Sequence, residues 1–114
     1  MPSKEDLKRQ VYQEIDSRAE EIINLSKTIL SHPEPGFREV KTAHLVSNKF
    51  AELGIPFRAG LALTGVRGEL VGSSAGPTMA LIGELDSLIV NEHPFADPTT
   101  GAAHACGHHC QLGM

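Results

Sequence analysis

The sequence has few aromatic residues and no tryptophan: Phe and Tyr together make up 4% of its 114 residues. This scarcity argues against a surface on which the bases of single-stranded nucleic acid could stack. Basic residues are also in the minority, because ten Lys and Arg face fourteen Asp and Glu, for a formal net charge of −4. Since a phosphate backbone is held by clustered positive charge, we expect no nucleic-acid partner.

Long apolar runs and an apolar leader segment are missing as well. The most apolar stretch, Met79–Val90, is interrupted by Glu84 and Asp86 and is far shorter than the roughly 20 residues of a membrane-spanning helix. The chain is charged from Lys4 onward, which is untypical of a secretory signal. These absences predict a cytoplasmic protein with no membrane partner. In a reducing cytoplasm the two cysteines are thiols or metal ligands rather than a structural disulfide.

Apolar residues recur at helical spacing near the start of the chain. The pattern predicts one amphipathic helix over Lys4–Ser31. Its apolar stripe consists of Leu7, Val11, Ile15, Ala19, Ile22 and Ile29. The two prolines of the segment His32–Gly36 must end this helix, because each disfavours helical geometry in the preceding residue. A second helix is predicted over Phe37–Leu53, with Gly54 at the position of a left-handed cap.

After Gly54 the sequence pattern changes to short apolar runs separated by glycine, which is typical of strands. Three strands are predicted, at Ile55–Arg58, Gly65–Val71 and Thr78–Leu85. The third is nearly continuous in apolar residues, so we expect a central strand buried on both faces. Asp86 would then lie at its carboxyl end, where open α/β sheets bind ligands. Ile89–Ala103 is predicted to be a surface loop, and a third helix begins near Gly107.

The order of these elements predicts an α/β fold in which two N-terminal helices pack on a mixed β-sheet. The length allows one domain at most. These elements form only the beginning of such a layered fold, so we expect the chain to be a truncated domain. The last strand would leave an unpaired edge that is prone to association, so a homo-oligomer is left open.

The most informative motif is the run His104–Cys110, which holds five metal-binding side chains in seven positions. A thiolate and a neutral imidazole are both good ligands for zinc and its neighbours, and Cys106 and His108 flank a glycine that lets both turn toward one centre. His104, His109 and Cys110 add to the potential ligand count. The alternative is a solvated terminal segment whose composition arose by chance.

Four segments carry a family resemblance, in the order in which they occur. They are His32–Glu39, Ala62–Val66, Gly83–Leu88 and Gly101–His108. Together they resemble the start of the M20 metallopeptidase and amidohydrolase family, in its aminoacylase and carboxypeptidase branch. The resemblance runs from about residue 7 to the last residue. It implies that the whole chain, 1–114, is the N-terminal part of one aminopeptidase-like catalytic domain.

The resemblance also implies roles for three residues. Cys106 and His108 would be metal ligands of a dinuclear site, with the thiolate suited to bridging two ions. Asp86 would be the catalytic-site carboxylate that supports the metal and its ligands. Branch members commonly have Asp where this chain has His109 and His where it has Gln111. Glu84 occupies an acidic position of the motif, and no role is assigned to it.

The implied activity is metal-dependent hydrolysis of an amide bond in an N-acyl amino acid or peptide. Two divalent ions, of zinc, manganese, cobalt or nickel, would polarise the carbonyl and activate a water. The remaining ligands and the proton-shuttling glutamate lie further along the sequences of the resembled family. We therefore expect this chain to be inactive alone.

Two other classes of function are weighed against the hydrolase. A non-catalytic or partner-dependent fragment follows from the missing ligands. A thiol redox module is suggested by Cys106 and Cys110, but three residues separate them where redox pairs have two. The remaining histidines are expected to be structural or solvated: His32 in the loop that ends the first helix, His44 beside an apolar helix face and His93 exposed in a loop. His104 either points into the site or orients its loop through a hydrogen bond.

Overall fold

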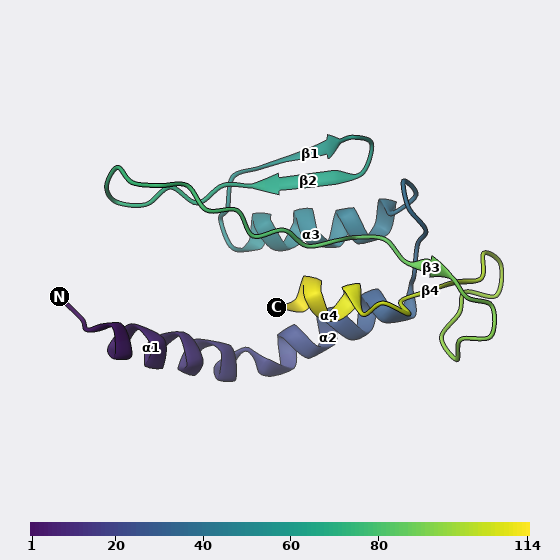
Figure 1. Ribbon diagram of the computed structural model, residues 1–114, viewed down its shortest axis with the longest axis horizontal. Helices are drawn as coiled ribbons and strands as arrows, with labels where there is room; N and C mark the ends of the chain where they lie inside the picture. The colour runs from purple at the N-terminus through teal and green to yellow at the C-terminus, as the bar shows by residue number, and fades with distance from the viewer.

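The N-terminal segment is helical but has a break that its apolar stripe does not reveal. In the computed structural model, which describes all residues 1–114, α1 spans Lys4–Ser17 and α2 spans Ala19–Ser31. Arg18 between them leaves helical geometry, with φ −105° and ψ 8°. The prediction of one continuous helix is therefore wrong at this residue. Figure 1 shows why the halves differ: α2 lies beside α4 and α3, whereas α1 extends away and buries none of its residues.

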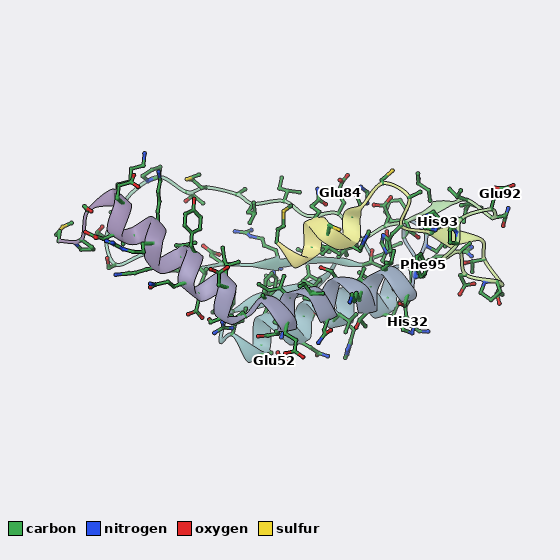
Figure 2. The ribbon with its side chains drawn as sticks, turned by 90° about the horizontal axis from the view of Figure 1, so that it is seen from below. His32, Glu52, Glu84, Glu92, His93 and Phe95 are labelled. Atoms are coloured by element: carbon green, nitrogen blue, oxygen red, sulfur yellow. The ribbon has the colours of Figure 1, made fainter.

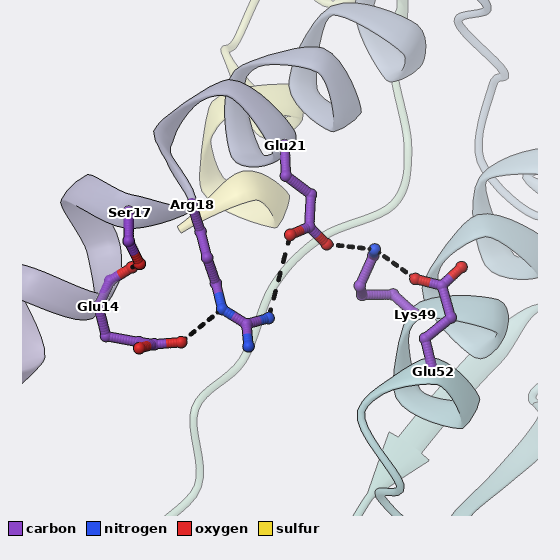
Figure 3. Close-up of polar contacts among 6 residues, drawn as sticks. All are labelled: Glu14, Ser17, Arg18, Glu21, Lys49 and Glu52. Carbon is purple, nitrogen blue, oxygen red and sulfur yellow. Dashed lines mark hydrogen bonds and ion pairs between the residues drawn. The ribbon is translucent and has the colours of Figure 1, made fainter.

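A chain of ion pairs runs across this break on the surface of the molecule (Figure 3). The Arg18 guanidinium lies 2.6 Å from Glu14 and 3.9 Å from Glu21, and the Lys49 ammonium lies 2.7 Å from Glu21. Lys49 also pairs with Glu52. The carboxylates of Glu21 and Glu52 together hold the pKa of Lys49 above its usual value. Because all these groups are solvated, the pairs orient the helices more than they stabilise them.

The helix α3, Val40–Glu52, begins three residues later than predicted and is capped by a residue outside it. Its own N-cap residue makes no side-chain cap bond. Instead, the carboxylate of Glu34 accepts hydrogen bonds from the backbone N–H of Lys41 at 3.1 Å and of Thr42 at 2.7 Å. The buried Thr42 hydroxyl donates a third bond to it at 2.8 Å. At the other end Gly54 takes φ 68°, which confirms the predicted left-handed cap.

The first two predicted strands are confirmed with shifted ends. β1, Phe57–Leu61, pairs antiparallel with β2, Gly65–Gly68, and α3 covers one face of this hairpin (Figure 1). Ala62 and Leu63 in the turn both have positive φ, at 45° and 82°. The next residue, Thr64, donates from its hydroxyl to the buried carboxylate of Glu39 at 2.7 Å. This bond fixes the turn against the start of α3.

The third predicted strand, Thr78–Leu85, is wrong. Residues 69–86 form neither helix nor strand, and residues 70–86 make no backbone-to-backbone hydrogen bond. Met79, Leu81 and Ile82 are 91%, 97% and 78% exposed. A strand buried on both faces needs a neighbouring strand at each edge and a covering layer on each face, and this chain provides neither here. The segment runs as an extended chain from the β1–β2 hairpin to the short strand at Leu88–Ile89 (Figure 1).

The last quarter of the chain holds a short antiparallel pair and one short helix. β3, Leu88–Ile89, pairs with β4, Ala102–Ala103, across the predicted surface loop, and α4 spans His108–Gly113. Gly107 takes φ 85° just before α4, which confirms the predicted helix start. An isolated parallel bridge joins Pro35 to Ser87. The chain is thus α/β, but the predicted single mixed sheet is replaced by two separate antiparallel pairs.

The core is small and lies between α2, the start of α3 and the β3–β4 pair. Only nine residues are buried, and Ile29 and Thr42 are the largest of them with fully buried side chains. The radius of gyration is 16.2 Å, against about 13 Å for a compact domain of this length. None of the helices combines the length and apolar character that crossing a bilayer requires.

We predict that Glu34→Ala lowers the free energy of unfolding by about 1–2 kcal/mol, because two N–H groups at the start of α3 lose their capping acceptor. Urea denaturation followed by circular dichroism measures this change. Glu20→Ala is the matched control, since Glu20 is an exposed helical carboxylate with no hydrogen bond or ion pair. Equal stability of the two variants would contradict the capping role.

We predict that the amides of Met79–Gly83 exchange with solvent at close to the rate of an unstructured peptide, because none of them donates a hydrogen bond. The amides around the buried Ile29 should be protected. Hydrogen exchange read by mass spectrometry or NMR checks both. Strong protection at Met79–Gly83 in the 114-residue monomer would show that a strand forms there after all.

Candidate metal centre

The carboxylate of Asp86 is positioned by its buried neighbour Ser87. The backbone N–H and the hydroxyl of Ser87 both donate to the backbone carbonyl of Glu34, at 2.9 and 2.8 Å. Ser87 also forms the parallel bridge to Pro35. The predicted site residue Asp86 is therefore held at a fixed point beside the segment that ends α2. Asp86 lies in a loop, and not at the carboxyl end of a strand as predicted.

The helix α4 brings His108 to the same point from the other end of the chain. The tight pairing of β3 with β4 returns the backbone, and the left-handed Gly107 turns it into α4. The helix then packs on α2 so closely that a Cβ at Gly113 would lie 2.0 Å from the Ser26 hydroxyl. A side chain at this position would have to displace the Ser26 hydroxyl, so Gly113 allows α4 to pack closely on α2.

Acceptor atoms surround both ring nitrogens of His108. Nδ1 lies 2.9 Å from the backbone oxygen of Asp86 and 3.1 Å from its carboxylate Oδ1. Nε2 lies 3.1 Å from Oε2 of Glu84. The potential ligand atoms of Glu84, Asp86 and His108 all lie within 4.8 Å of one another. We call these three residues the carboxylate–histidine group.

This arrangement suits a cation between His108 and Glu84. A neutral imidazole that donates its Nδ1 proton to Asp86 turns its Nε2 lone pair toward a carboxylate oxygen that also carries lone pairs. Two such donors repel unless a proton or a metal ion lies between them. A nitrogen and an oxygen on one tetrahedral zinc ion are about 3.4 Å apart, and the observed separation of 3.1 Å is close to that. The donor set therefore fits a divalent metal.

Glu84 is the site residue that sequence reasoning missed. Its backbone N–H donates to the side-chain oxygen of Gln111 at 2.7 Å, which ties it to the first turns of α4 (Figure 2). Gln111 stands where branch members of the resembled family commonly have His. The signal that could have found Glu84 is its spacing, because Glu84 and Asp86 are two apart in an extended segment and so share one face.

The two cysteines lie outside the carboxylate–histidine group. Both are free thiols and both are exposed. The assignment of Cys106 as a metal ligand therefore stays a prediction, whereas His108 and Asp86 are brought together. Cys110, in the first turn of α4, does not face the interior: its sulfur lies at the surface, 3.3 Å from Nε2 of His109.

The other histidines divide into solvated and buried ones. His32 is exposed, with Nδ1 2.9 Å from the Thr28 carbonyl, and His44 is exposed on α3. His93 was expected to be exposed but is half-buried, because its ring lies against Phe95 with centroids 6.1 Å apart (Figure 2).

His104 is 4% exposed and has no hydrogen-bond partner, so it does not orient its loop by such a bond. Burial lowers the pKa of His104, and the imidazoles of His109 and His108 lower it further. Burial also lowers the pKa of His109, with a smaller effect of His93. The pKa values of His104 and His109 therefore both lie below the usual histidine value, which favours neutral imidazoles at neutral pH.

The chain is similar over most of its length to proteins of known or assigned activity. It is 32% identical over 105 residues to the Bacillus subtilis protein YhaA, named as an amidohydrolase, which covers 90% of this chain and 26% of that protein. It is 35% identical over 97 residues to thermostable carboxypeptidase 1 of Saccharolobus solfataricus, covering 82% and 25%. It is 35% identical over 91 residues to the N-acetylcysteine deacetylase of B. subtilis, covering 76% and 24%.

The chain thus spans about a quarter of the length of the curated relatives it matches. No family profile matches it, and no solved structure does.

We predict opposite tautomers for two neutral histidines. Nδ1 of His108 faces two acceptors from Asp86, at 2.9 and 3.1 Å, and Nε2 faces one from Glu84, so we expect the neutral ring to carry its proton on Nδ1. In His44, Nδ1 lies 3.2 Å from the amide nitrogen of Asn48 and accepts a proton from it, so its proton resides on Nε2. Nitrogen-15 NMR of the ring nitrogens above the histidine titration range distinguishes the two forms. A proton on Nε2 of His108 would contradict the arrangement.

Proposed function

Because the chain is related to the M20-like amidohydrolases, carboxypeptidases and deacetylases, as its sequence motifs predict, we propose that it forms part of a metal-dependent hydrolase of amide bonds. The observation that carries the proposal is the carboxylate–histidine group. It joins the loop with Glu84 and Asp86 to His108, the last residue of the Cys-Gly-His motif and the first residue of α4. Its donors match those that divalent metals take in hydrolases.

In this proposal His108 binds the metal through Nε2, and Glu84 supplies a carboxylate oxygen to the same ion. Asp86 accepts the Nδ1 proton of His108, which fixes the ring and makes Nε2 more basic. Cys106 lies two residues before His108, and its exposed thiol is free to serve as the bridging ligand of a second ion. When bound, the metal would supply a Lewis acid for the amide carbonyl and a water of lowered pKa.

We propose that residues 1–114 are the N-terminal part of a single catalytic domain. Two observations support this. The relatives are about four times as long as the matched segment. The apolar segment around Leu81 and Ile82 has the composition of a central strand but lies exposed and unpaired. On this proposal the chain lacks the remaining metal ligands and is inactive alone, with zinc, manganese, cobalt or nickel as the metal of the complete dinuclear site.

The proposed substrates are N-acyl amino acids or peptides. The relatives are named for removing acyl groups from amino acids and for cleaving carboxyl-terminal residues, and both reactions break an amide bond next to an amino acid. The cytoplasmic location and a homo-oligomeric state stay predictions.

An alternative is a non-catalytic fragment that folds fully only with a partner chain. The same exposed segment favours it, since its unpaired edge can accept a strand from another molecule. A thiol redox module has no such support, because three residues separate Cys106 from Cys110 where redox pairs have two.

We predict that the carboxylate–histidine group of the 114-residue chain binds a divalent metal weakly and that this chain shows no turnover, whereas a form extended in frame retains metal at this group and hydrolyses N-acetyl amino acids. In the extended form, His108→Ala should remove the metal held by the carboxylate–histidine group, and Asp86→Asn should weaken metal binding there by about 10- to 100-fold. Metal analysis after gel filtration and an amidase assay measure both quantities.

Glu84→Gln in the extended form should lower metal affinity, with Glu92→Gln as its matched control. Glu92 is an exposed loop carboxylate away from the carboxylate–histidine group (Figure 2). Full turnover by the short chain would refute the proposal that it is an incomplete domain. Unchanged metal content and activity in Cys106→Ser would refute the thiolate ligand.

A further inference from the structure

A second group of potential ligands lies beside the candidate metal centre but is not part of it. His104 follows β4, and His109 and Cys110 lie in the first turn of α4. None of these three side chains belongs to the carboxylate–histidine group. His109 and His108 are adjacent on a helix, so their side chains point in directions about 100° apart.

The two imidazoles hold all the buried side-chain nitrogen and oxygen atoms that lack a hydrogen-bond partner. They are Nδ1 and Nε2 of His104 and Nδ1 of His109. His104 is only 4% exposed, so solvent does not satisfy its ring. Buried polar atoms in proteins are nearly always bonded, and an unbonded one calls for a ligand or an ordered water. One occupant between the two neighbouring rings would satisfy one nitrogen of His104 together with Nδ1 of His109.

The spacing of the rings suits a metal ion held between them. The centroids of His104 and His109 are 5.6 Å apart and the rings are inclined by 51°. Two imidazoles on one tetrahedral zinc ion, with Zn–N of about 2.0–2.1 Å, place their centroids about 5 Å apart. The Cys110 sulfur lies 3.3 Å from His109 Nε2, which leaves Nδ1 of His109 as the nitrogen available to the ion.

We propose that His104 and His109 bind a transition-metal ion separate from the carboxylate–histidine group. Imidazole donors suit zinc, copper and nickel and disfavour magnesium and calcium. The ion would join the β3–β4 pair to α4 and so fix the helix that carries His108. The proposal is independent of amide hydrolysis, because none of its ligands is assigned to the carboxylate–histidine group.

The test uses a background in which the first centre cannot form. In the double variant Cys106→Ser/His108→Ala, the 114-residue chain is dialysed against ZnCl₂ and analysed for bound metal after gel filtration. We expect about one equivalent of zinc, and none of magnesium from MgCl₂. Adding His109→Ala to this background should remove the zinc, and adding His44→Ala, the exposed helical control, should leave it.

Two further measurements keep the proposal testable if a variant misfolds. His104→Gln preserves most of the side-chain volume and should lose zinc while circular dichroism shows an unchanged helix content. Cobalt(II) should give a d–d absorption in the background variant that disappears when His109→Ala is added. Absence of zinc binding in the background, or equal binding after His109→Ala, would overturn the proposal and assign the unbonded atoms to an internal water. Neither result bears on metal binding by His108, which the extended form tests separately.

Discussion

The arrangement of the whole chain depends on the two ends of one residue, Glu34. Its carboxylate accepts the free N–H groups at the start of α3, and its backbone carbonyl accepts both bonds from Ser87. The first interaction sets the direction of α3 and, through it, the position of the β1–β2 hairpin. The second places the loop that carries Asp86. The prolines on either side of Glu34 end α2 and hold the backbone extended, so both contacts are available at once.

The loop that carries Asp86 also gives the two ring nitrogens of His108 different partners. Asp86 holds one ring nitrogen and Glu84 faces the other, so the ring lies between two carboxylates. A metal ion at Nε2 would leave the Nδ1 proton bonded to Asp86, which would hold the ring in place. Gln111 contributes by holding the backbone of Glu84 from α4. The site is therefore built from two segments that each position the other.

Local features of the fold could be predicted from the sequence, and non-local ones could not. The caps at Gly54 and Gly107 were predictable because each depends on one residue that tolerates positive φ. The approach of Asp86 to His108 followed from the family resemblance. The break at Arg18 was not predictable, since the apolar stripe continues through it and only the surroundings of the two halves differ. The strand expected at Thr78–Leu85 failed because a strand is completed by its neighbours, whereas composition reports only the strand itself.

The contact between Glu34 and Ser87 closes a loop of 53 residues, and α4 reaches α2 across an even longer stretch of chain. Closing such loops costs chain entropy that no nearby contact repays in advance. The helices and the β1–β2 hairpin join neighbouring residues and need no such closure. During folding, the side chains of the candidate metal centre are therefore the last to meet, after the helices and the hairpin have formed.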